Sequence, residues 1–254
     1  MSLNIGKSPS VTDALNTRIT VRDFLDTPVS EDVLQSLFST AQRTASGGNL
    51  QPWHVHVMTG DKLAIFKKDA VERAQAGKTD VPTYQAYPSP LWEPQRSWRY
   101  KLGEDMYALL GIEKDNKMGR LMWLMQNIKF FEAPVGIIIT GDKRLEMPQH
   151  LDVGIYVQSL MLLAREAGLH TAPQGWWRNW HSVCHDHLDI AEEDEVLVGM
   201  SLGYANPDAP VNSLYADRAS LNEISPFQST QFVPTGHFLP SPACNAGYGL
   251  IKKP

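Results

Sequence analysis

The sequence predicts an α+β domain in which helices flank one central sheet. Two strongly apolar stretches, at residues 133–141 and 195–204, have the pattern of buried strands. Between them, residues 151–167 carry apolar side chains at helical spacing and end before Gly168, a candidate C-cap. Helix and strand patterns alternate along the chain without an internal repeat, which predicts a layered domain around one sheet.

The first part of the chain is expected to contain helices and one strand. A short helix is expected at residues 11–16. Ser30 is a candidate N-cap for a second helix, whose apolar face extends to Ala41. Residues 54–59 alternate between polar and apolar, which is typical of a strand, and Asp61 is the candidate cap of the helix that follows.

The middle of the chain is expected to form an aromatic loop followed by helices. Residues 80–97 are rich in proline, tyrosine and tryptophan, which predicts an ordered loop with aromatic anchors. Two helices are expected at residues 98–110 and 117–130, and a shorter one at 179–188. The helix at 117–130 is apolar almost all round, so its methionines and its tryptophan either pack in the core or line a pocket.

Composition excludes some classes of partner. The chain has 254 residues and a formal net charge of −5, which argues against nucleic acid or an anionic membrane as the main partner. No apolar run is long enough to span a membrane, and the first residues lack a signal-peptide core, so a cytoplasmic protein is expected. Cys184 and Cys244 lie in dissimilar surroundings, which makes a disulfide framework unexpected.

A cationic segment near the N-terminus is a candidate anion clamp. Arg18, Thr20 and Arg22 occupy alternate positions. On an extended backbone they would point one way and could hold a phosphate with two guanidinium groups and one hydroxyl. The alternative is a solvated strand edge.

A turn of small and amide residues follows at residues 45–53. Its two glycines let the backbone approach a flat ligand, and its two amides can donate and accept hydrogen bonds along a heterocycle edge. A plain turn is the alternative. Together with the cationic segment, this turn fits a planar ring that carries a phosphate. The candidate ligand residues of the turn are Ser46, Gly47, Asn49 and Gln51.

Four motifs follow one another in an order that is more specific than any one of them. Arg-x-Thr-x-Arg-x-Phe ends at Phe24, Ser-Gly-Gly-Asn-Leu-Gln-Pro-Trp spans 46–53, Phe-Phe-Glu-Ala-Pro-Val-Gly spans 130–136 and Ala-Pro-Gln-Gly spans 172–175. This order resembles the FMN-dependent nitroreductase family, in particular its bacterial nitrobenzoate and nitrobenzene reductases. The resemblance implies a nitroreductase-like fold with a central mixed, mainly antiparallel sheet.

The resemblance also implies a cofactor and an assembly. The expected protein is a homodimer with FMN at the subunit interface. Arg218 would supply a third cation to the FMN phosphate, but Ile19 and Tyr215 depart from the family pattern and leave the contact set open. The residues implied at the flavin N5 are Pro173, Gln174 and Gly175.

The domain organisation follows from the extent of the resemblance, which covers about residues 9–227. A single nitroreductase-like domain is expected at residues 1–227. Residues 228–254 have no matching counterpart, so this C-terminal extension either wraps the partner subunit or forms a tail.

The implied activity is ping-pong hydride transfer, from NADH or NADPH to FMN and then to a nitroaromatic or similar electron-poor acceptor. The cofactor carries this chemistry, so no catalytic residue is nominated. Trp176, Trp177 and the aromatic loop from Tyr84 to Trp92 are candidates to stack the aromatic acceptor. Arg178 either pairs with a substrate carboxylate or is solvated.

Two other functions remain open at this point. One is a flavin-binding regulatory or sensor protein with little turnover. The other is an oxidoreductase of the same superfamily that acts on enones, quinones or halogenated aromatics.

A histidine-rich segment is the candidate for a metal site. His181, Cys184, His185 and His187 fall within seven residues and could bind zinc or copper. On a helix, the first three share a face and His187 does not. No recognisable partner pair completes a tetrahedral set, and the counterpart helix in the family carries histidines without metal, so no metal ion is expected.

Overall fold

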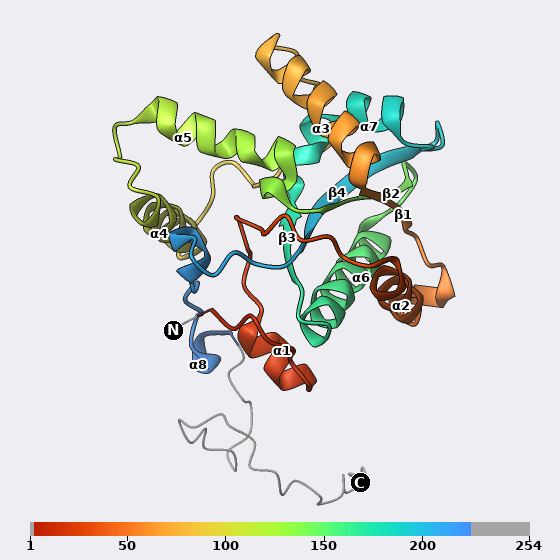
Figure 1. Ribbon diagram of the computed structural model, residues 1–254, viewed down its shortest axis with the longest axis horizontal. Helices are drawn as coiled ribbons and strands as arrows, with labels where there is room; N and C mark the ends of the chain where they lie inside the picture. Colours follow the sequence, from red (N-terminus) through yellow and green to blue (C-terminus); the bar gives the residue numbers. More distant parts are fainter. Residues whose placement is uncertain (1–2, 225–254) are drawn as a thin grey trace, which may run out of the picture. The chain divides into compact units, whose positions relative to one another are not determined.

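A computed structural model describes residues 3–224 of the chain (Figure 1). The chain divides into two compact units, Met1–Ala216 and Asp217–Pro254. Within its described residues the second unit contains one short helix, α8 (Leu221–Ile224). The predicted extension at residues 228–254 lies outside the described residues. The first unit contains the sheet and the helices that cover it.

The first unit is built on a four-stranded antiparallel sheet with the strand order β1-β2-β4-β3. The two central strands correspond to the two strongly apolar stretches of the sequence, and β2 is buried on both faces as far as its last residue. A parallel bridge joins Thr20 to Thr171 at the outer edge of β3. This arrangement confirms the predicted α+β class. The strands are β1 (His54–Thr59), β2 (Val135–Asp142), β3 (His170–Gln174) and β4 (Asp194–Gly203).

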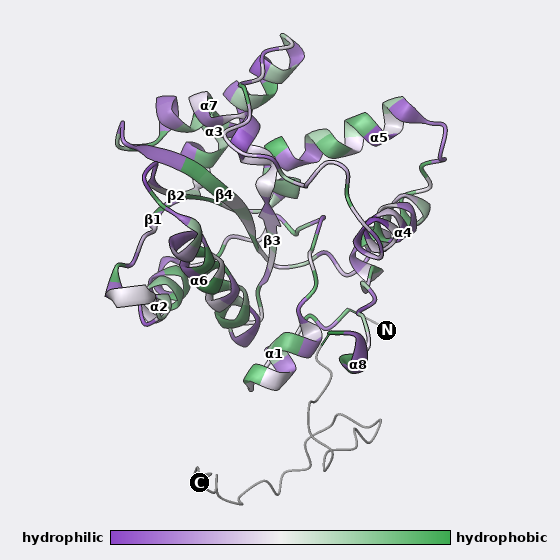
Figure 2. Cartoon of the chain, turned by 180° about the vertical axis from the view of Figure 1, so that it is seen from behind, coloured by the Kyte–Doolittle hydropathy of each residue, from purple (hydrophilic) through white to green (hydrophobic). Residues whose placement is uncertain are grey.

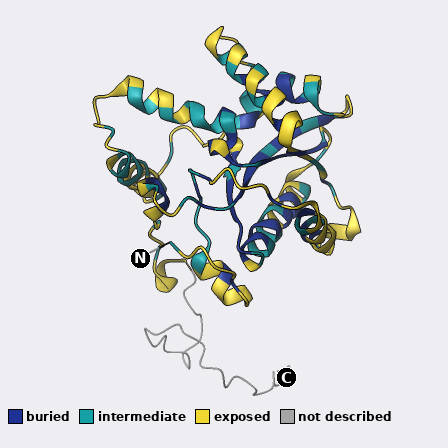
Figure 3. Cartoon of the chain, in the orientation of Figure 1, coloured by how far each residue is buried: buried dark blue, intermediate teal, exposed yellow. Residues whose placement is uncertain are grey.

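Helices cover both faces of the sheet (Figure 1). Helices α2 (Glu31–Ala41) and α6 (Met147–Glu166) lie on one face, where they form a core with Ile137 and Ile139 of β2. Ile138 faces the opposite core, which includes residues of α3 (Gly60–Gln75) and α7 (His181–His187). Because successive strand residues point to opposite faces, one apolar run supplies both cores. Figure 3 shows that the buried residues concentrate in the sheet and in α6.

Two helix starts differ from the sequence prediction. Helix α6 begins at Met147 rather than at residue 151, because Glu146 and Gln149 form a capping box and Pro148 occupies the first turn. Asp61 is not the cap of α3, because Gly60, with a φ of 51°, already belongs to the helix. A glycine adopts this backbone conformation at little cost, so the strand turns directly into the helix.

The apolar helix predicted at residues 117–130 is shorter than expected. Helix α5 (Lys117–Leu124) gives way to the 3-10 segment η2 (Met125–Glu132). Within η2, Phe130 and Phe131 both have positive φ angles, and both rings are buried. The helix therefore ends in a left-handed backbone at these two residues, and both of their rings enter the core.

The exposed face of α5 corrects a packing prediction. Met118 and Met122 are exposed by 66% and 58%, so they do not pack in the core of this chain. Trp123 packs against the core. Figure 2 shows hydrophobic positions distributed along α5.

The remaining helical segments complete the first unit. The aromatic loop ends earlier than predicted, since α4 (Gln95–Leu109) already begins at residue 95. No helix in residues 3–224 has the length and apolar character needed to cross a membrane. The other segments are α1 (Val11–Thr17), η1 (Gly47–Asn49), η3 (Gly175–Asn179) and η4 (Pro210–Ser213).

Candidate functional site

The clamp segment, residues 18–22, lies against the outer edge of β3. Thr20 forms the bridge to Thr171, and the Val21 N–H donates to the Thr171 carbonyl at 3.1 Å. Val21 is fully buried. Alternation along an extended backbone leaves Arg18, Thr20 and Arg22 on the opposite side, and all three are partly accessible. The segment is thus paired with β3, and the common orientation of the three side chains stays a prediction from their spacing.

Arg22 carries a charge that the described chain does not neutralise. Its Nη1 donates to the Thr20 carbonyl at 3.3 Å, and no ion pair joins it to a carboxylate within residues 3–224. Burial lowers the pKa of Arg22, and the nearby Tyr87 phenol opposes this shift. A partly desolvated cation without a carboxylate partner is suited to bind an anion.

Asn212 anchors the end of the clamp segment through backbone hydrogen bonds at Arg22 and Asp23. Its Oδ1 accepts the backbone N–H of Arg22 at 2.9 Å, and its Nδ2 donates to the carbonyls of Asp23 and Asn206 at 2.7 and 2.9 Å. The residue is buried in η4, about 190 positions along the chain. The sequence prediction missed this role, since a single asparagine in a loop gives no local signal.

The amide loop, residues 46–51, has an unusual backbone. Gly48, Asn49 and Gln51 have φ angles of 57°, 58° and 49°, of which two belong to non-glycine residues. The loop is closed by the Gln51 N–H, which donates to Ser46 Oγ at 3.0 Å. Left-handed residues of this kind store strain and concentrate at ligand sites. The side chains of Asn49 and Gln51 are exposed and accessible to a ligand.

Helix α6 contacts the amide loop at Gly47 and the chain just after the loop at Trp53. The carboxylate of Asp152 accepts the Gly47 N–H at 3.2 and 3.1 Å. One turn further along, the Tyr156 ring stacks on Trp53, with ring centroids 4.6 Å apart. Both side chains are buried. The sequence analysis does not name Asp152, although an acidic residue inside a strongly apolar helix is a signal, because a buried carboxylate needs a specific partner.

The Pro-Gln-Gly step, residues 173–175, lies at the end of β3. Its glutamine side chain and its glycine backbone have different surroundings. The Gln174 side chain is buried and donates to the Asn127 carbonyl at 2.8 Å, so it serves the core. Pro173 remains within β3 and pairs with β4. Gly175 is exposed at the start of η3. What this step can offer a ligand is therefore backbone around Gly175.

The two neighbouring tryptophans have different environments. Trp177 is fully buried and stacks on Phe130, with ring centroids 4.7 Å apart. A ring without exposed surface cannot stack on an acceptor, so Trp177 leaves the set of proposed substrate contacts. Trp176 is partly exposed, and its Nε1 has no hydrogen-bond partner.

The aromatic loop brings Tyr84 close to Gly175 at the start of η3. Its hydroxyl donates to the Leu197 carbonyl at 2.6 Å. The hydroxyl oxygen also lies close to Gly175, since a Cβ added to that glycine would be 3.6 Å from it. The Asp80 N–H donates to the Asn179 carbonyl at 2.9 Å, which ties the loop to η3. Tyr84 thus acts as the predicted aromatic anchor, whereas Trp92 is 58% exposed.

The histidine-rich segment of α7 does not form a metal site in the described chain. Cys184 is buried in the core, and burial raises the pKa of its thiol. His187 Nε2 lies 2.8 Å from the Asp69 carboxylate. No group of three or more His, Cys, Asp or Glu side chains in residues 3–224 is arranged to hold a metal ion.

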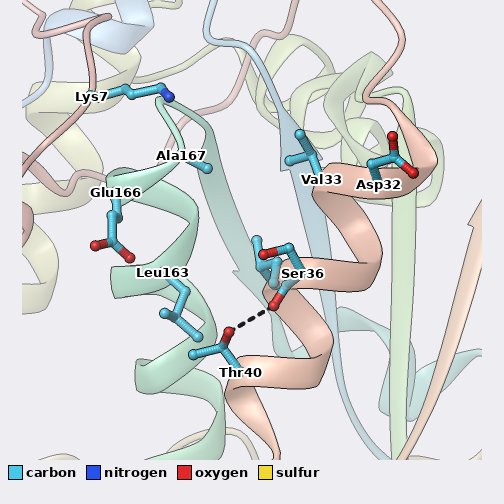
Figure 4. Close-up of a pocket in the computed structure, with 9 residues that line it drawn as sticks. Lys7, Asp32, Val33, Ser36, Thr40, Leu163, Glu166 and Ala167 are labelled. Carbon is cyan, nitrogen blue, oxygen red and sulfur yellow. Dashed lines mark hydrogen bonds between the residues drawn. The ribbon is translucent and has the colours of Figure 1, made fainter.

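A separate cavity of about 320 Å³ opens between α2 and α6 (Figure 4). Lys7, Asp32 and Glu166 contribute its charged groups. It contains none of the residues of the clamp segment or the amide loop.

The clamp segment and the amide loop lie at opposite edges of the sheet (Figure 1). The clamp segment adjoins β3, and the amide loop leads into β1. Strands β2 and β4 separate these edges. One chain therefore does not bring the two halves of the predicted ligand site together. Arg218, the predicted third cation, belongs to the second unit.

The comparison with known families identifies the group to which this chain belongs. Residues 15–204 match the model of the nitroreductase family. The chain belongs to the nitroreductase family. Among its relatives, the chloronitrobenzene nitroreductase of Comamonas testosteroni is 35% identical over 225 residues, which are 87% of this chain and 97% of the relative. The 4-nitrobenzoate reductase of Pseudomonas putida is 37% identical, over 80% of this chain and 88% of the relative.

Solved structures agree with this family assignment. The FMN and NADPH-dependent nitroreductase NfnB from Sphigopyxis sp. strain HMH superposes on this chain with a TM-score of 0.83 at 36% identity. The match covers 87% of this chain and 99% of that structure. The predicted nitroreductase-like fold is therefore confirmed.

Proposed function

We propose that the protein is an FMN-dependent oxidoreductase that uses NADPH or NADH to reduce nitroaromatic or similarly electron-poor acceptors. The observation that carries the proposal is Arg22, a partly desolvated guanidinium without a carboxylate partner in residues 3–224, in the clamp segment of a nitroreductase-family chain. The relatives named for nitroaromatic substrates and the FMN and NADPH-dependent structure support the same activity.

The residues present fit a flavin mononucleotide. Arg18, Thr20 and Arg22 provide two cations and a hydroxyl for its phosphate. The amides of Asn49 and Gln51 fit the polar edge of its ring, and bound FMN would supply the hydride-transfer chemistry. The chain's own part is to bind and orient, so no side chain is assigned as acid or base.

A homodimer is part of the proposal because one chain leaves the site divided. The clamp segment of one subunit would face the amide loop of its partner. An exposed apolar stripe on α6, at Met147, Leu151 and Ile155, supports such an assembly, since these residues are spaced by four and lie on one helix face. A cytoplasmic location also belongs to the proposal, because reduced nicotinamide nucleotides are available there.

The test is an anaerobic absorbance spectrum of the purified protein, recorded before and after NADPH or NADH and again after nitrobenzene. We expect a flavin spectrum that bleaches with the nucleotide and returns with the nitro compound. A flavin that stays oxidised would support the regulatory alternative. Failure to bind FMN even on reconstitution would exclude the proposed function.

Light scattering of the same preparation tests the assembly. We expect a dimer, and we expect dilution to monomers to release flavin. A monomer that retains flavin with full occupancy would contradict the divided site.

A further inference from the structure

The acceptor segment, residues 175–180, has polar atoms that the protein leaves without partners. Trp176 Nε1, Arg178 Nε, Asn179 Oδ1 and Trp180 Nε1 are buried and make no hydrogen bond. They are four of seven such side-chain atoms within residues 3–224. Buried polar atoms are normally paired, so this concentration of exceptions singles out the segment among the described residues.

Arg178 is the charged member of this group. Its Nη1 donates to the Gly175 carbonyl at 2.6 Å, and its guanidinium carbon lies 5.8 Å from the centre of the Tyr84 ring. No ion pair to a carboxylate is formed by Arg178 in the described part of the chain. A guanidinium charge therefore lies beside the exposed Gly175 turn and beside an aromatic ring.

The surrounding contacts hold Arg178 in this place. The Thr83 N–H donates to the Arg178 carbonyl at 3.4 Å, so the aromatic loop is attached to the backbone of the acceptor segment. Burial raises the pKa of Tyr84, and the charge of Arg178 opposes that rise, which reflects their proximity. The backbone of Arg178 and, through Nη1, its guanidinium are therefore both hydrogen-bonded within this part of the protein.

We propose that Arg178 selects acceptors that carry a carboxylate on the aromatic ring. A guanidinium presents parallel N–H donors that match a carboxylate, and the hydrogen bond of this guanidinium within residues 3–224 is the one from Nη1 to the Gly175 carbonyl. The acceptor ring would lie beside Tyr84 and Trp176 while its carboxylate pairs with Arg178. This inference rests on the proposed function and names its substrate class as nitroaromatic acids.

The experiment compares two acceptors that differ in one charge. FMN-loaded protein is assayed with 4-nitrobenzoate and with its neutral methyl ester, and the ratio of their kcat/KM values is measured for wild type, Arg178→Gln and Arg178→Lys. We expect the wild type to favour the acid. Arg178→Gln should lower the acid-to-ester ratio by about ten- to hundredfold, since it removes a charge-assisted pair. Arg178→Lys should recover part of the ratio, because it keeps the charge but loses the planar fork.

Arg144→Gln is the matched control. Arg144 is an exposed arginine that pairs with Asp142, outside the acceptor segment, so its removal should leave the acid-to-ester ratio unchanged. An unchanged ratio in Arg178→Gln would overturn the inference. So would a change confined to the preference for NADPH over NADH, because the charge would then serve the phosphate of the electron donor. If the wild type reduces neither acceptor, the proposed function itself fails.

Discussion

The amide loop and the acceptor segment differ in how the protein satisfies their polar groups. In the amide loop, the Gly47 N–H is bound by Asp152 and the Gln51 N–H by Ser46. In the acceptor segment, the Nε of Arg178 is buried without a partner. The backbone of the first region is paired by the chain itself, whereas the second keeps polar groups that the described chain does not pair. This difference fits the proposed function, in which a resident cofactor needs a preformed loop and a charged substrate needs a cation that the described chain does not already pair with a carboxylate.

The largest effect is expected for Tyr156, the α6 residue whose ring stacks on Trp53 just after the amide loop. Tyr156→Ala removes a fully buried ring that stacks on Trp53, so the free energy of unfolding should fall by about 3–5 kcal/mol. Urea denaturation measures this change. The matched control is Tyr156→Phe, which keeps the ring and removes a hydroxyl that has no partner, so it should be nearly neutral. Equal losses in both variants would mean that the hydroxyl, not the stack, supports the loop.

The pH dependence of stability tests His170, the first residue of β3. The acceptor segment follows the last residue of the same strand. Burial, assisted by the charge of Arg165, lowers the pKa of His170 to about 4. The unfolded chain binds this proton near pH 6.5, so stability should be full above that pH and fall by about 3 kcal/mol between pH 6.5 and 4. The measurement is the difference in unfolding free energy between wild type and His170→Asn across this range.

His150→Asn, at an exposed position, controls for the loss of a histidine and should leave the pH dependence of the wild type in place. A His170→Asn variant with the same slope as the wild type would show that other groups dominate the acid limb.

A substitution of Arg22 should weaken FMN binding without lowering the stability of the apoprotein. Arg22→Gln removes a partly desolvated cation that lacks a carboxylate partner, so FMN affinity should fall by about 1.5–3 kcal/mol. The apoprotein should be as stable as the wild type or slightly more so, because a desolvated charge is removed. Fluorescence titration with FMN and thermal unfolding of the apoprotein give the two values. Unchanged affinity would place the phosphate elsewhere.

The smallest expected effect concerns the anchor of the amide loop. Asp152→Ala leaves the Gly47 N–H without its acceptor, and both apoprotein stability and FMN affinity should fall by about 1–3 kcal/mol. Asp152→Asn retains one carbonyl acceptor and should lose less. The two quantities are measured as for Arg22. If Asp152→Ala binds FMN as tightly as the wild type, the loop does not depend on α6 for its shape.

Local patterns predicted most of the elements and part of the site. The alternation at residues 54–59 predicts β1 with the boundaries that the structure has. The alternate spacing of Arg18, Thr20 and Arg22 predicts that they share one side of an extended segment, and the structure pairs this segment with β3. In both cases the signal is a two-residue period, which depends only on neighbouring residues.

Predictions that depended on partners distant in the sequence were less successful. Trp176 and Trp177 are chemically identical, and the turn of η3 alone decides that the second ring enters the core. Asp152 contacts the amide loop across about 105 positions, and a one-dimensional pattern does not register such a contact. The start of α6 was missed because its capping box lies in a polar stretch.

The sequence by itself determined the buried strands, the apolar helices and the cationic spacing of the clamp segment, because these follow from periods of 2 and 3.6 residues. Only the tertiary structure decided that the clamp segment and the amide loop lie at opposite edges of the sheet, and that Arg178 lies beside Tyr84. The reason is physical: strand order and loop docking are set by the burial of whole apolar faces against one another. This burial brings together residues that lie far apart in the sequence and have no periodic spacing.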